Sequence, residues 1–275
     1  MSELTSTERY VVPGLQRGLQ VLAQFTNTTR ELTGAELSRR MGLPRASVFR
    51  LLQTLEQMGF VERVGDSGSY KLGLAVLRLG FEYLASMELT EHGRPVLDDL
   101  CINTGLSSHL VVRDGSEVVF VVKAAGRTSL YNAIQVGARL PAHATVLGRV
   151  LLADLSMADL RELYPQPQLE AFTSQTPTTL IQLKQLVDQD RQRGYGISQG
   201  GYEVGISTIA APVFDDRDKV VAAVSVTVTG NRVQADKVES LVAHVRAAAA
   251  KLSQRIHHLP LIAAKPSPQL EKMFA

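Results

Sequence analysis

The sequence predicts a two-domain α+β chain: an N-terminal winged helix-turn-helix, a linker helix and a C-terminal domain built on an antiparallel sheet. A capped helix, a glycine turn, a second helix and a hairpin follow one another in residues 12–73. An apolar helical stretch occupies 74–89, and residues 90–259 alternate hairpins with helices. The segment 260–275 contains three prolines and is expected to form a flexible tail. A length of 275 residues fits about two domains.

The composition is that of a globular chain. Hydrophobic residues make up 45%, which is enough for packed cores and excludes intrinsic disorder. Cys101 is the single cysteine, which excludes a disulfide framework and a thiolate zinc cluster. The formal net charge of +2 is too small to predict nucleic-acid binding by itself. The first ten residues lack the apolar run of a signal peptide, and no apolar run reaches the ~20 residues of a membrane helix, so we expect a cytoplasmic chain without membrane contact.

The first helices are marked by their ends. After Pro13, one apolar face is predicted for Leu15, Leu19, Leu22 and Phe25. Thr33 and Glu36 have the spacing of a capping box, and Gly42 ends the short helix that they begin. A second short helix is therefore predicted directly after the first.

A third helix and a hairpin complete the domain. Pro44 suits the first turn of this helix, whose apolar stripe is Val48, Leu51, Leu52 and Leu55. Gly59 ends it. Residues 60–64 and 70–72 are strand-like and flank the turn 65–69. A hairpin at this place is a wing, so the domain is predicted to be a winged helix-turn-helix.

The outward face of the third helix is the candidate DNA-binding surface. Its outward residues are predicted to be Arg45, Ala46, Ser47, Phe49, Arg50 and Gln53. The N-terminal residues of such a helix meet base edges in the major groove, where Arg bonds guanine and small or aromatic groups touch the thymine methyl. Thr33 and Lys71 are expected to contact the same DNA from the preceding helix and the wing. Double-stranded operator DNA is therefore the expected partner.

The charge pattern supports this surface only locally. Between residues 30 and 50, five arginines face two glutamates, whereas the first ninety residues hold ten basic and nine acidic groups. Two alternatives remain open: the arginines only solubilise a small helical domain, or the domain docks another protein.

The linker helix is too apolar to stand alone in water. Leu74, Leu77, Phe81 and Leu84 share one face, and further apolar residues widen it. The helix packs either on its own winged domain or on a second copy of the chain. We favour a homodimer, because a symmetric operator needs two DNA-binding domains.

The C-terminal domain is predicted from two hairpins and the helices around them. The hairpins comprise 108–123, with an Asp-Gly turn, and 209–229. A helix over Val96–Cys101 precedes them, and the other helices are expected at 146–155, 156–164, 179–193 and 235–258. Strands in hairpins with helices segregated around them indicate an α+β domain.

One strand of this domain suggests a binding cavity. In Val220–Thr229, one alternate set of residues is all valine and alanine and predicts a core face. The other set is Val221, Ala223, Ser225, Thr227 and Thr229, and short hydroxyls beside small apolar groups suit a sheltered cavity. A covered edge or an ordinary outer face is the alternative.

The loop at residues 141–148 suggests a second part of this cavity. It leads into a helix whose first amides, at Val146 and Leu147, point outward and suit a carboxylate. His143 is a candidate contact in the same loop. Alternatively, Thr145 is only an N-cap and His143 a hinge residue. Since His143 has no companion at metal-ligand spacing, no metal site is predicted.

Nothing in the sequence predicts catalysis or a cofactor. A nucleophile elbow, a phosphate-binding glycine loop and a metalloprotease motif are all missing from the chain. An enzyme that turns over its ligand is the competing function class, and it lacks a nucleophile and an acid–base pair.

The chain resembles the IclR (isocitrate lyase regulator) family of bacterial transcriptional regulators over roughly Val12 to His258. The motifs that carry the resemblance are Pro44–Leu52 with Leu55 and Gly59, Tyr70–Gly73, Ala142–Thr145 with Gly148 and Arg149, Arg193–Tyr195, and Gly205 with Ile209–Asp215. The resemblance implies a GAF-like effector-binding domain behind the DNA-binding domain, in a chain that works as a homodimer or a dimer of dimers. It also implies pocket contacts at the Val146 and Leu147 backbone and at Ser198, Thr208, Ser225 and Thr227.

The resemblance implies a ligand-responsive regulator, with repression as the default. Family effectors are small organic acids or aromatic metabolites, which suggests control of a catabolic or efflux operon. Ser198 stands where many members have an acidic residue, and Thr208 where many have cysteine. This less charged pocket favours a neutral, aromatic or hydroxylated effector.

Overall fold

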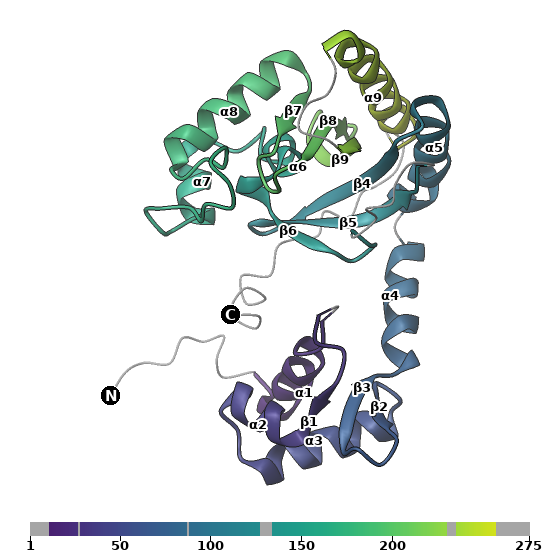
Figure 1. The fold of residues 1–275 in the computed structure, drawn as a ribbon, viewed down its shortest axis with the longest axis vertical. Coiled ribbons are helices and arrows are strands. Elements are labelled where there is room, and N and C mark those ends of the chain that lie inside the picture. The colour runs from purple at the N-terminus through teal and green to yellow at the C-terminus, as the bar shows by residue number, and fades with distance from the viewer. Residues whose placement is uncertain (1–10, 27, 87, 127–133, 230–234, 257–275) are drawn as a thin grey trace. The chain divides into compact units, whose positions relative to one another are not determined.

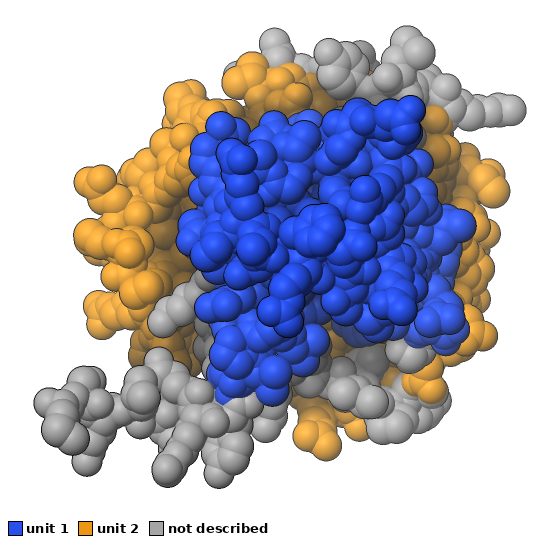
Figure 2. Space-filling view, turned by 90° about the horizontal axis from the view of Figure 1, so that it is seen from below, with its two compact units in different colours: residues 1–84, 268–275 blue, residues 85–267 orange. Residues whose placement is uncertain are grey.

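A computed structural model of the chain describes residues 11–26, 28–86, 88–126, 134–229 and 235–256 (Figure 1). The predicted tail, 260–275, and the predicted helix end at 257–258 lie outside these residues. The chain divides into two compact units after Leu84 (Figure 2). No helix within the described ranges is both long enough and apolar enough to cross a membrane.

The first unit is a helical domain with a small sheet. Its elements are α1 (Pro13–Ala23), β1 (Leu32–Thr33), α2 (Gly34–Met41), α3 (Arg45–Gln57), β2 (Val61–Val64) and β3 (Ser69–Leu72). The helix α4 (Leu74–Ser86) follows and contains the division between the units. The sheet is antiparallel in the order β1-β3-β2. The predicted wing is β2 and β3, and β1 is a third strand that the sequence analysis missed.

Local chemistry fixes the ends of α2. The Thr33 hydroxyl accepts a hydrogen bond from the Glu36 amide at 3.2 Å, and the Glu36 carboxylate accepts one from the Thr33 amide at 2.8 Å. Gly42 closes the helix at φ 62°, a left-handed conformation that glycine adopts without steric cost. The predicted capping box and glycine stop are therefore present. Pro44 is the N-cap of α3, one residue before the predicted first turn.

The core of the first unit corrects the predicted face of α1. Val21 and Phe25 are buried with Leu37, Val48 and Leu52. Leu15 and Leu19 are instead 63% and 48% exposed, because only the C-terminal end of α1 reaches this core. The N-terminal turns of α1 thus present apolar side chains to solvent.

The second unit is built on one six-stranded sheet. Its strands are β4 (Ser107–Asp114), β5 (Glu117–Ala124), β6 (Arg139–Pro141), β7 (Gly196–Gln199), β8 (Ile206–Phe214) and β9 (Val220–Thr229). The sheet is antiparallel throughout, in the order β6-β5-β4-β9-β8-β7. The two predicted hairpins are β4–β5 and β8–β9, and they join through the central pair β4 and β9.

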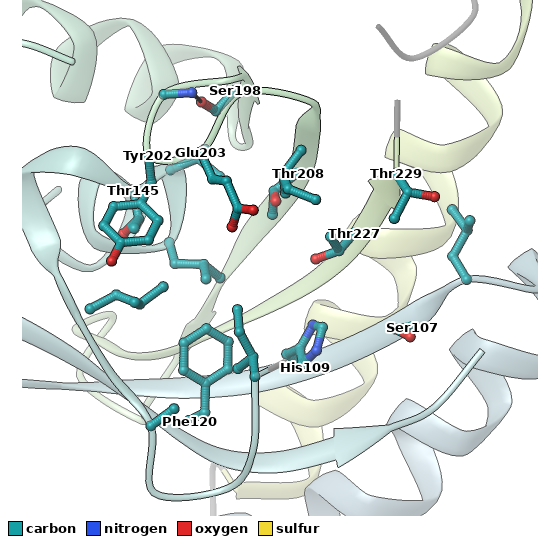
Figure 3. Close-up of a pocket in the computed structure, with 18 residues that line it drawn as sticks. Ser107, His109, Phe120, Thr145, Ser198, Tyr202, Glu203, Thr208, Thr227 and Thr229 are labelled. Atoms are coloured by element: carbon teal, nitrogen blue, oxygen red, sulfur yellow. Dashed lines mark hydrogen bonds between the residues drawn. The ribbon is translucent and has the colours of Figure 1, made fainter. Parts of the chain in front are cut away.

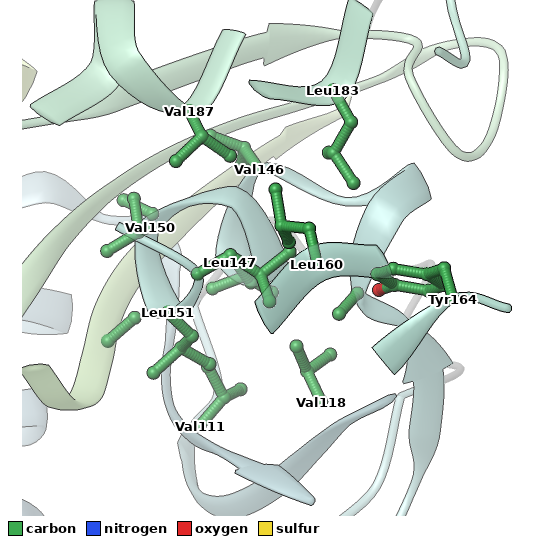
Figure 4. Close-up of a cluster of buried hydrophobic side chains, with 14 of the residues drawn as sticks. Val111, Val118, Val146, Leu147, Val150, Leu151, Leu160, Tyr164, Leu183 and Val187 are labelled. Atoms are coloured by element: carbon green, nitrogen blue, oxygen red, sulfur yellow. The ribbon is translucent and has the colours of Figure 1, made fainter. Parts of the chain in front are cut away.

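Helices cover both faces of this sheet (Figure 1). The helices of the unit are α5 (Glu88–Thr104), α6 (Val146–Leu151), α7 (Met157–Leu163), α8 (Leu180–Arg193) and α9 (Ala235–Ile256). On one face lie α5 and α9, where the Ser108 hydroxyl donates to the carbonyl of Leu97 on α5. On the other face lies α6, backed by α7 and α8, in a buried apolar cluster (Figure 4).

The covering of both faces corrects the prediction for β9. Ala223 was predicted on the cavity face, but it belongs to the apolar cluster beneath α6. Farther along the same face, Thr227 is only partly buried and Thr229 is exposed. The face therefore changes along the strand from packed core to an open polar end, since α6 covers only its first part.

An ion pair is buried between α6 and α8. Arg149 Nε donates to Asp190 Oδ2 at 2.7 Å, and its Nη2 donates to the Ile197 carbonyl of β7 at 2.9 Å. Both side chains are more than nine-tenths buried. Burial raises the pKa of Asp190, while the charge and hydrogen bond of Arg149 oppose that shift. The ion pair and the hydrogen bond to Ile197 therefore connect α6, α8 and β7.

Candidate functional site

The N-terminal half of α3 presents an exposed surface with two guanidinium groups. Arg45, Ala46, Phe49 and Arg50 are exposed, and Ser47 is half-buried. Among the described residues, the guanidinium groups of Arg45 and Arg50 have no hydrogen-bond or ion-pair partner. Phe49, 56% exposed, lies between them in sequence. The surface therefore holds donors and an apolar ring that no other part of this unit uses.

Three other predicted contacts of this surface are already engaged. Gln53 is half-buried and donates to Glu56 Oε2 at 3.1 Å. The Thr33 hydroxyl donates to Glu36 Oε2 at 2.8 Å as part of the helix cap. Lys71, on the wing, pairs with Glu62 at 3.4 Å. Each would have to exchange a partner within the chain for a phosphate or a base.

The wing is fixed to α3 by Arg63. Its Nε donates to both carboxylate oxygens of Glu56, at 3.0 and 3.1 Å, and its guanidinium lies over the Tyr70 ring, 5.3 Å from the ring centre. This arginine was not singled out from the sequence. It holds the hairpin against the helix that carries Arg45 and Arg50.

The second unit contains a cavity of about 360 Å³ on the α6 face of its sheet (Figure 3). Six short hydroxyl side chains line it: Ser107, Thr145, Ser198, Thr208, Thr227 and Thr229. Its apolar wall includes Leu106, Phe120, Ile134, Leu140, Leu147 and Ile206. Of the residues predicted from the sequence, Val146, Leu147, Ser198, Thr208 and Thr227 lie in this lining.

Strand register explains why the hydroxyls gather. Ser198 of β7 pairs with Thr208 of β8, Thr208 pairs with Thr227 of β9, and Thr227 pairs with Ser107 of β4. Directly opposed residues in an antiparallel sheet point to the same face. One row of hydroxyls therefore crosses four strands, from segments as far apart in sequence as residues 107 and 227.

The next row across the sheet is His109 of β4 beside Ser225 of β9. His109 lines the cavity and is only 4% exposed, and its ring meets Phe120 edge-on with centres 5.4 Å apart. His109 was missed from the sequence. The alternation used for β9, applied to Ser107–Val111, would have placed Ser107 and His109 on one face, but not beside Thr227 and Ser225.

Two predicted contacts are corrected here. His143 is buried but lies outside the cavity lining, and its Nε2 donates to the Glu170 carbonyl at 2.9 Å between Tyr164 and Phe172. Ser225 is fully buried beside His109 and is not part of the cavity lining. In both cases the loop or strand was identified, but packing determined which of its residues reach the cavity.

The start of α6 forms one wall of the cavity. The Thr145 hydroxyl caps α6 by accepting from the Gly148 amide at 3.0 Å, so the N-cap interpretation is correct, and Thr145 also lines the cavity. A Cβ at Gly148 would lie 2.0 Å from the Ala142 carbonyl oxygen. Glycine therefore lets the loop fold tightly against the helix.

A loop between β7 and β8 provides another wall. Tyr202 and Glu203 line the cavity from this loop (Figure 3). The hydroxyls of Thr173 and Thr176 hold it by donating to the carbonyls of Gly200 and Gly201, each at 2.7 Å. The ring of Phe172 also packs against that of Tyr202, with the two ring centres 5.0 Å apart.

The charge of the lining is sparse and acidic. Among the described residues that line it, Glu203 is the only carboxylate, and none is a lysine or arginine. Burial, with a smaller effect of nearby Lys123, lowers the pKa of His109 to about 4, so its ring is neutral near pH 7. Within the described ranges, no group of three or more His, Cys, Asp or Glu side chains is placed to hold a metal ion.

Comparisons with known proteins identify both units. Residues 14–65 match the IclR helix-turn-helix domain, and residues 81–254 match the C-terminal domain of the bacterial transcriptional regulator IclR. The Pca regulon regulatory protein of Pseudomonas putida is 33% identical over 82% of this chain and 77% of its own length. The transcriptional repressor IclR of Escherichia coli is 30% identical over 88% and 89%.

A solved structure agrees with the fold. The putative transcriptional regulator RHA06195 from Rhodococcus sp. RHA1 has a TM-score of 0.79 and 30% identity, covering 90% of this chain and all of that one. Since the C-terminal match alone spans more than half of the residues, the chain belongs to the IclR family of bacterial transcriptional regulators, which are DNA-binding proteins and not enzymes.

Proposed function

We propose that this chain is a ligand-responsive repressor that binds operator DNA through α3 and a small organic acid or aromatic metabolite in the cavity of its second unit. The observation that carries the proposal is the pair Arg45 and Arg50, exposed on α3 with guanidinium groups that have no partner among the described residues. Repression is the proposed default because the relatives include named repressors. A regulator that responds to a metabolite suits a catabolic or efflux operon, and its chromosomal target puts it in the cytoplasm.

In this proposal α3 enters the major groove. Its first turns present Arg45, Ser47 and Arg50 to base edges, where a guanidinium bonds guanine through two donors. Phe49 would meet a thymine methyl, and Lys71 on the wing would contact a phosphate. Two copies of α3 would read half-sites about 34–36 Å apart, or a multiple of that distance.

The homodimer, or dimer of dimers, is part of the same proposal. Leu74, Leu77, Leu79 and Phe81 of α4 are all more than half exposed, and Leu15 of α1 is exposed too. An apolar surface of this kind is expected to be covered by another molecule. A second copy is the occupant that would also supply the second reading helix. Light scattering should give a multiple of the chain mass, and Phe81→Glu should lower it.

Ligand binding would change operator affinity through the relative arrangement of the two copies of α3 in the dimer. A small molecule that prefers one arrangement can shift operator affinity by about 1–3 kcal/mol, which is the usual range of coupling between two sites. The cavity lies in the second unit and α4 joins the units in sequence, so α4 is the proposed route of coupling.

A salt series tests the DNA-binding proposal. The full chain should retard DNA from upstream of its own coding region in a gel, and its affinity should fall steeply as salt rises from 50 to 200 mM, because phosphate contacts release counterions. The variant Arg45→Ala with Arg50→Ala should lose the shift. The matched control is Arg161→Ala, an exposed arginine of α7. Binding that ignores salt, or survives the double substitution, contradicts the proposal.

A further inference from the structure

Two buried polar atoms beside the cavity floor lack hydrogen-bond partners. They are His109 Nδ1 and Ser225 Oγ, and no other described side chain has a fully buried nitrogen or oxygen in this condition. His109 is 4% exposed and Ser225 is 0% exposed. Buried polar atoms in native proteins nearly always have a partner, so this pair requires a functional or structural explanation.

The two residues face each other across the sheet. His109 of β4 is directly opposite Ser225 of β9, so their side chains rise from neighbouring strands to the same face. No hydrogen bond joins them in this structure, and a rotation of the Ser225 hydroxyl toward Nδ1 would give each atom the other as its partner. Whichever role it takes fixes the proton of the other ring nitrogen, because a neutral imidazole has one donor and one acceptor.

The second ring nitrogen is the one that a ligand can reach. His109 lines the cavity, and Nδ1 is sealed from solvent, which leaves Nε2 for the cavity side (Figure 3). Since burial keeps the ring uncharged near neutral pH, Nε2 is a neutral hydrogen-bonding group. The hydroxyls of Ser107, Thr145 and Ser198, in contrast, already accept hydrogen bonds from backbone amides of the chain.

The rest of the lining limits the chemistry of the ligand. The cavity of about 360 Å³ exceeds the ~150 Å³ that suffices for benzene, so a single ring with substituents fits. Phe120, Leu140 and Leu147 supply apolar walls for such a ring. Of the charged side chains in the described lining, a carboxylate would meet Glu203 and no lysine or arginine.

We propose that His109 is the specificity-determining residue of the cavity, and that its ligand is an uncharged single-ring aromatic compound whose hydroxyl group hydrogen-bonds to the His109 imidazole. Ser225 is a positioning residue that sets the tautomer of that ring. The inference rests on the proposed function of the cavity as the effector site, and it narrows the effector class to hydroxylated arenes.

Matched ligand pairs test this proposal by calorimetry on the full chain. The probes are 4-hydroxybenzamide against benzamide, and 4-hydroxybenzoate against benzoate. We expect each hydroxylated compound to bind at least tenfold more tightly than its parent, and 4-hydroxybenzamide to bind more tightly than 4-hydroxybenzoate. Equal affinity within both pairs, or no binding of any probe, overturns the proposal. If 4-hydroxybenzoate binds more tightly than 4-hydroxybenzamide, the proposal that the ligand is uncharged is overturned.

Variants separate His109 from the rest of the cavity. His109→Phe should abolish the preference for the hydroxyl while benzamide affinity is kept, and Ser225→Ala should weaken the preference. The matched control is His244→Gln, a half-buried histidine of α9 that does not line the cavity. A hydroxyl preference that survives in His109→Phe overturns the assignment.

A measurement on the unmodified protein covers the case in which His109→Phe does not fold. The ¹⁵N shifts of the His109 ring should change when 4-hydroxybenzamide is added, because a new hydrogen bond alters the nitrogen that makes it. Unchanged shifts at saturating ligand contradict the proposal. Calorimetry needs no DNA, so a chain that prefers hydroxylated rings but binds no operator refutes the proposed function alone. A chain that binds operator and shows no such preference refutes this inference alone.

Discussion

The two units place arginine in opposite surroundings. In the first unit, Arg45 and Arg50 are exposed on α3, and their guanidinium groups have no partner among the described residues. In the second, Arg149 is buried and bound to Asp190 and to the Ile197 carbonyl. The side chain is chemically the same. The difference teaches that the fold decides its role, since a guanidinium with its donors satisfied inside cannot also bind an external partner.

Apolar side chains show the reverse contrast. The second unit covers both faces of its sheet, with α5 and α9 on one side and α6 on the other. The first unit leaves apolar residues exposed on α4, including Leu77 and Phe81. A surface left uncovered within one chain is expected to be covered by another molecule. The first unit is thus suited to contacts with other macromolecules, and the second to enclosing a small one.

Breaking the buried pair should have the largest effect. Asp190→Ala leaves Arg149 charged and buried, which costs about 3–5 kcal/mol and lowers the melting temperature by on the order of 10 °C. The double variant Arg149→Met with Asp190→Leu should recover most of the loss. Lys251→Ala, which breaks the exposed pair with Asp99, is the control and should change the melting temperature little. If Asp190→Ala and Lys251→Ala lower the melting temperature equally, the contrast between buried and exposed ion pairs does not hold.

Acid should destabilise the second unit through His109. Burial, assisted by Lys123, lowers the pKa of His109 to about 4 from its ordinary 6.5. The unfolded chain therefore binds the proton first, so the stability that the neutral ring provides is complete above pH 6.5 and is lost as the pH falls toward 4. Between pH 7 and pH 5, urea unfolding should show a loss about 2 kcal/mol larger than in His109→Gln. Identical losses would mean that His109 titrates normally.

An exposed arginine of α3 should affect binding and leave stability unchanged. Arg50→Ala should cost about 1–3 kcal/mol of operator affinity if Arg50 contacts a base, and it should relax the preference at one base position. Its melting temperature should equal that of the parent, because the Arg50 guanidinium has no partner within the described residues. Fluorescence anisotropy with single-base operator variants measures both effects. Unchanged affinity and preference would discard Arg50 as a reader, and Arg161→Ala is the charge-matched control.

The smallest effect is expected at the cap of α2. Thr33→Ala removes the hydroxyl that accepts the Glu36 amide, which costs roughly 1 kcal/mol of stability in the first unit, and Thr33→Ser should restore it. Because the hydroxyl is engaged within the chain, DNA affinity of the folded variant should stay close to that of the parent. A clear loss of affinity in folded Thr33→Ala would show instead the direct DNA contact that the sequence predicts.

The elements of the first unit were predictable because short-range interactions specify them. Thr33, Glu36 and Gly42 lie within ten positions of each other and define α2 without reference to the rest of the chain. The wing follows from a glycine-rich turn between two short strands in the same way. The buried face of α1 was predicted wrongly, because helical spacing shows that leucines share a face but not how far the core extends along it.

The cavity was predictable only in part. Alternation along β9 correctly placed Thr227 in the lining, and the family resemblance supplied Ser198 and Thr208. His109 was missed, and His143 was wrongly included. Residues of β4 and β9 lie more than a hundred positions apart, so their pairing depends on the complete sheet.

By itself the sequence determined which segments become helices and strands, where they stop, and which chemical groups each one carries, since capping, turn geometry and side-chain periodicity are local properties. Only the tertiary structure decided which of those groups meet. Strand register placed Ser198, Thr208, Thr227 and Ser107 in one row, and packing enclosed His109 while it left Arg45 and Arg50 exposed. Register and burial depend on contacts between distant segments, and no local pattern specifies these.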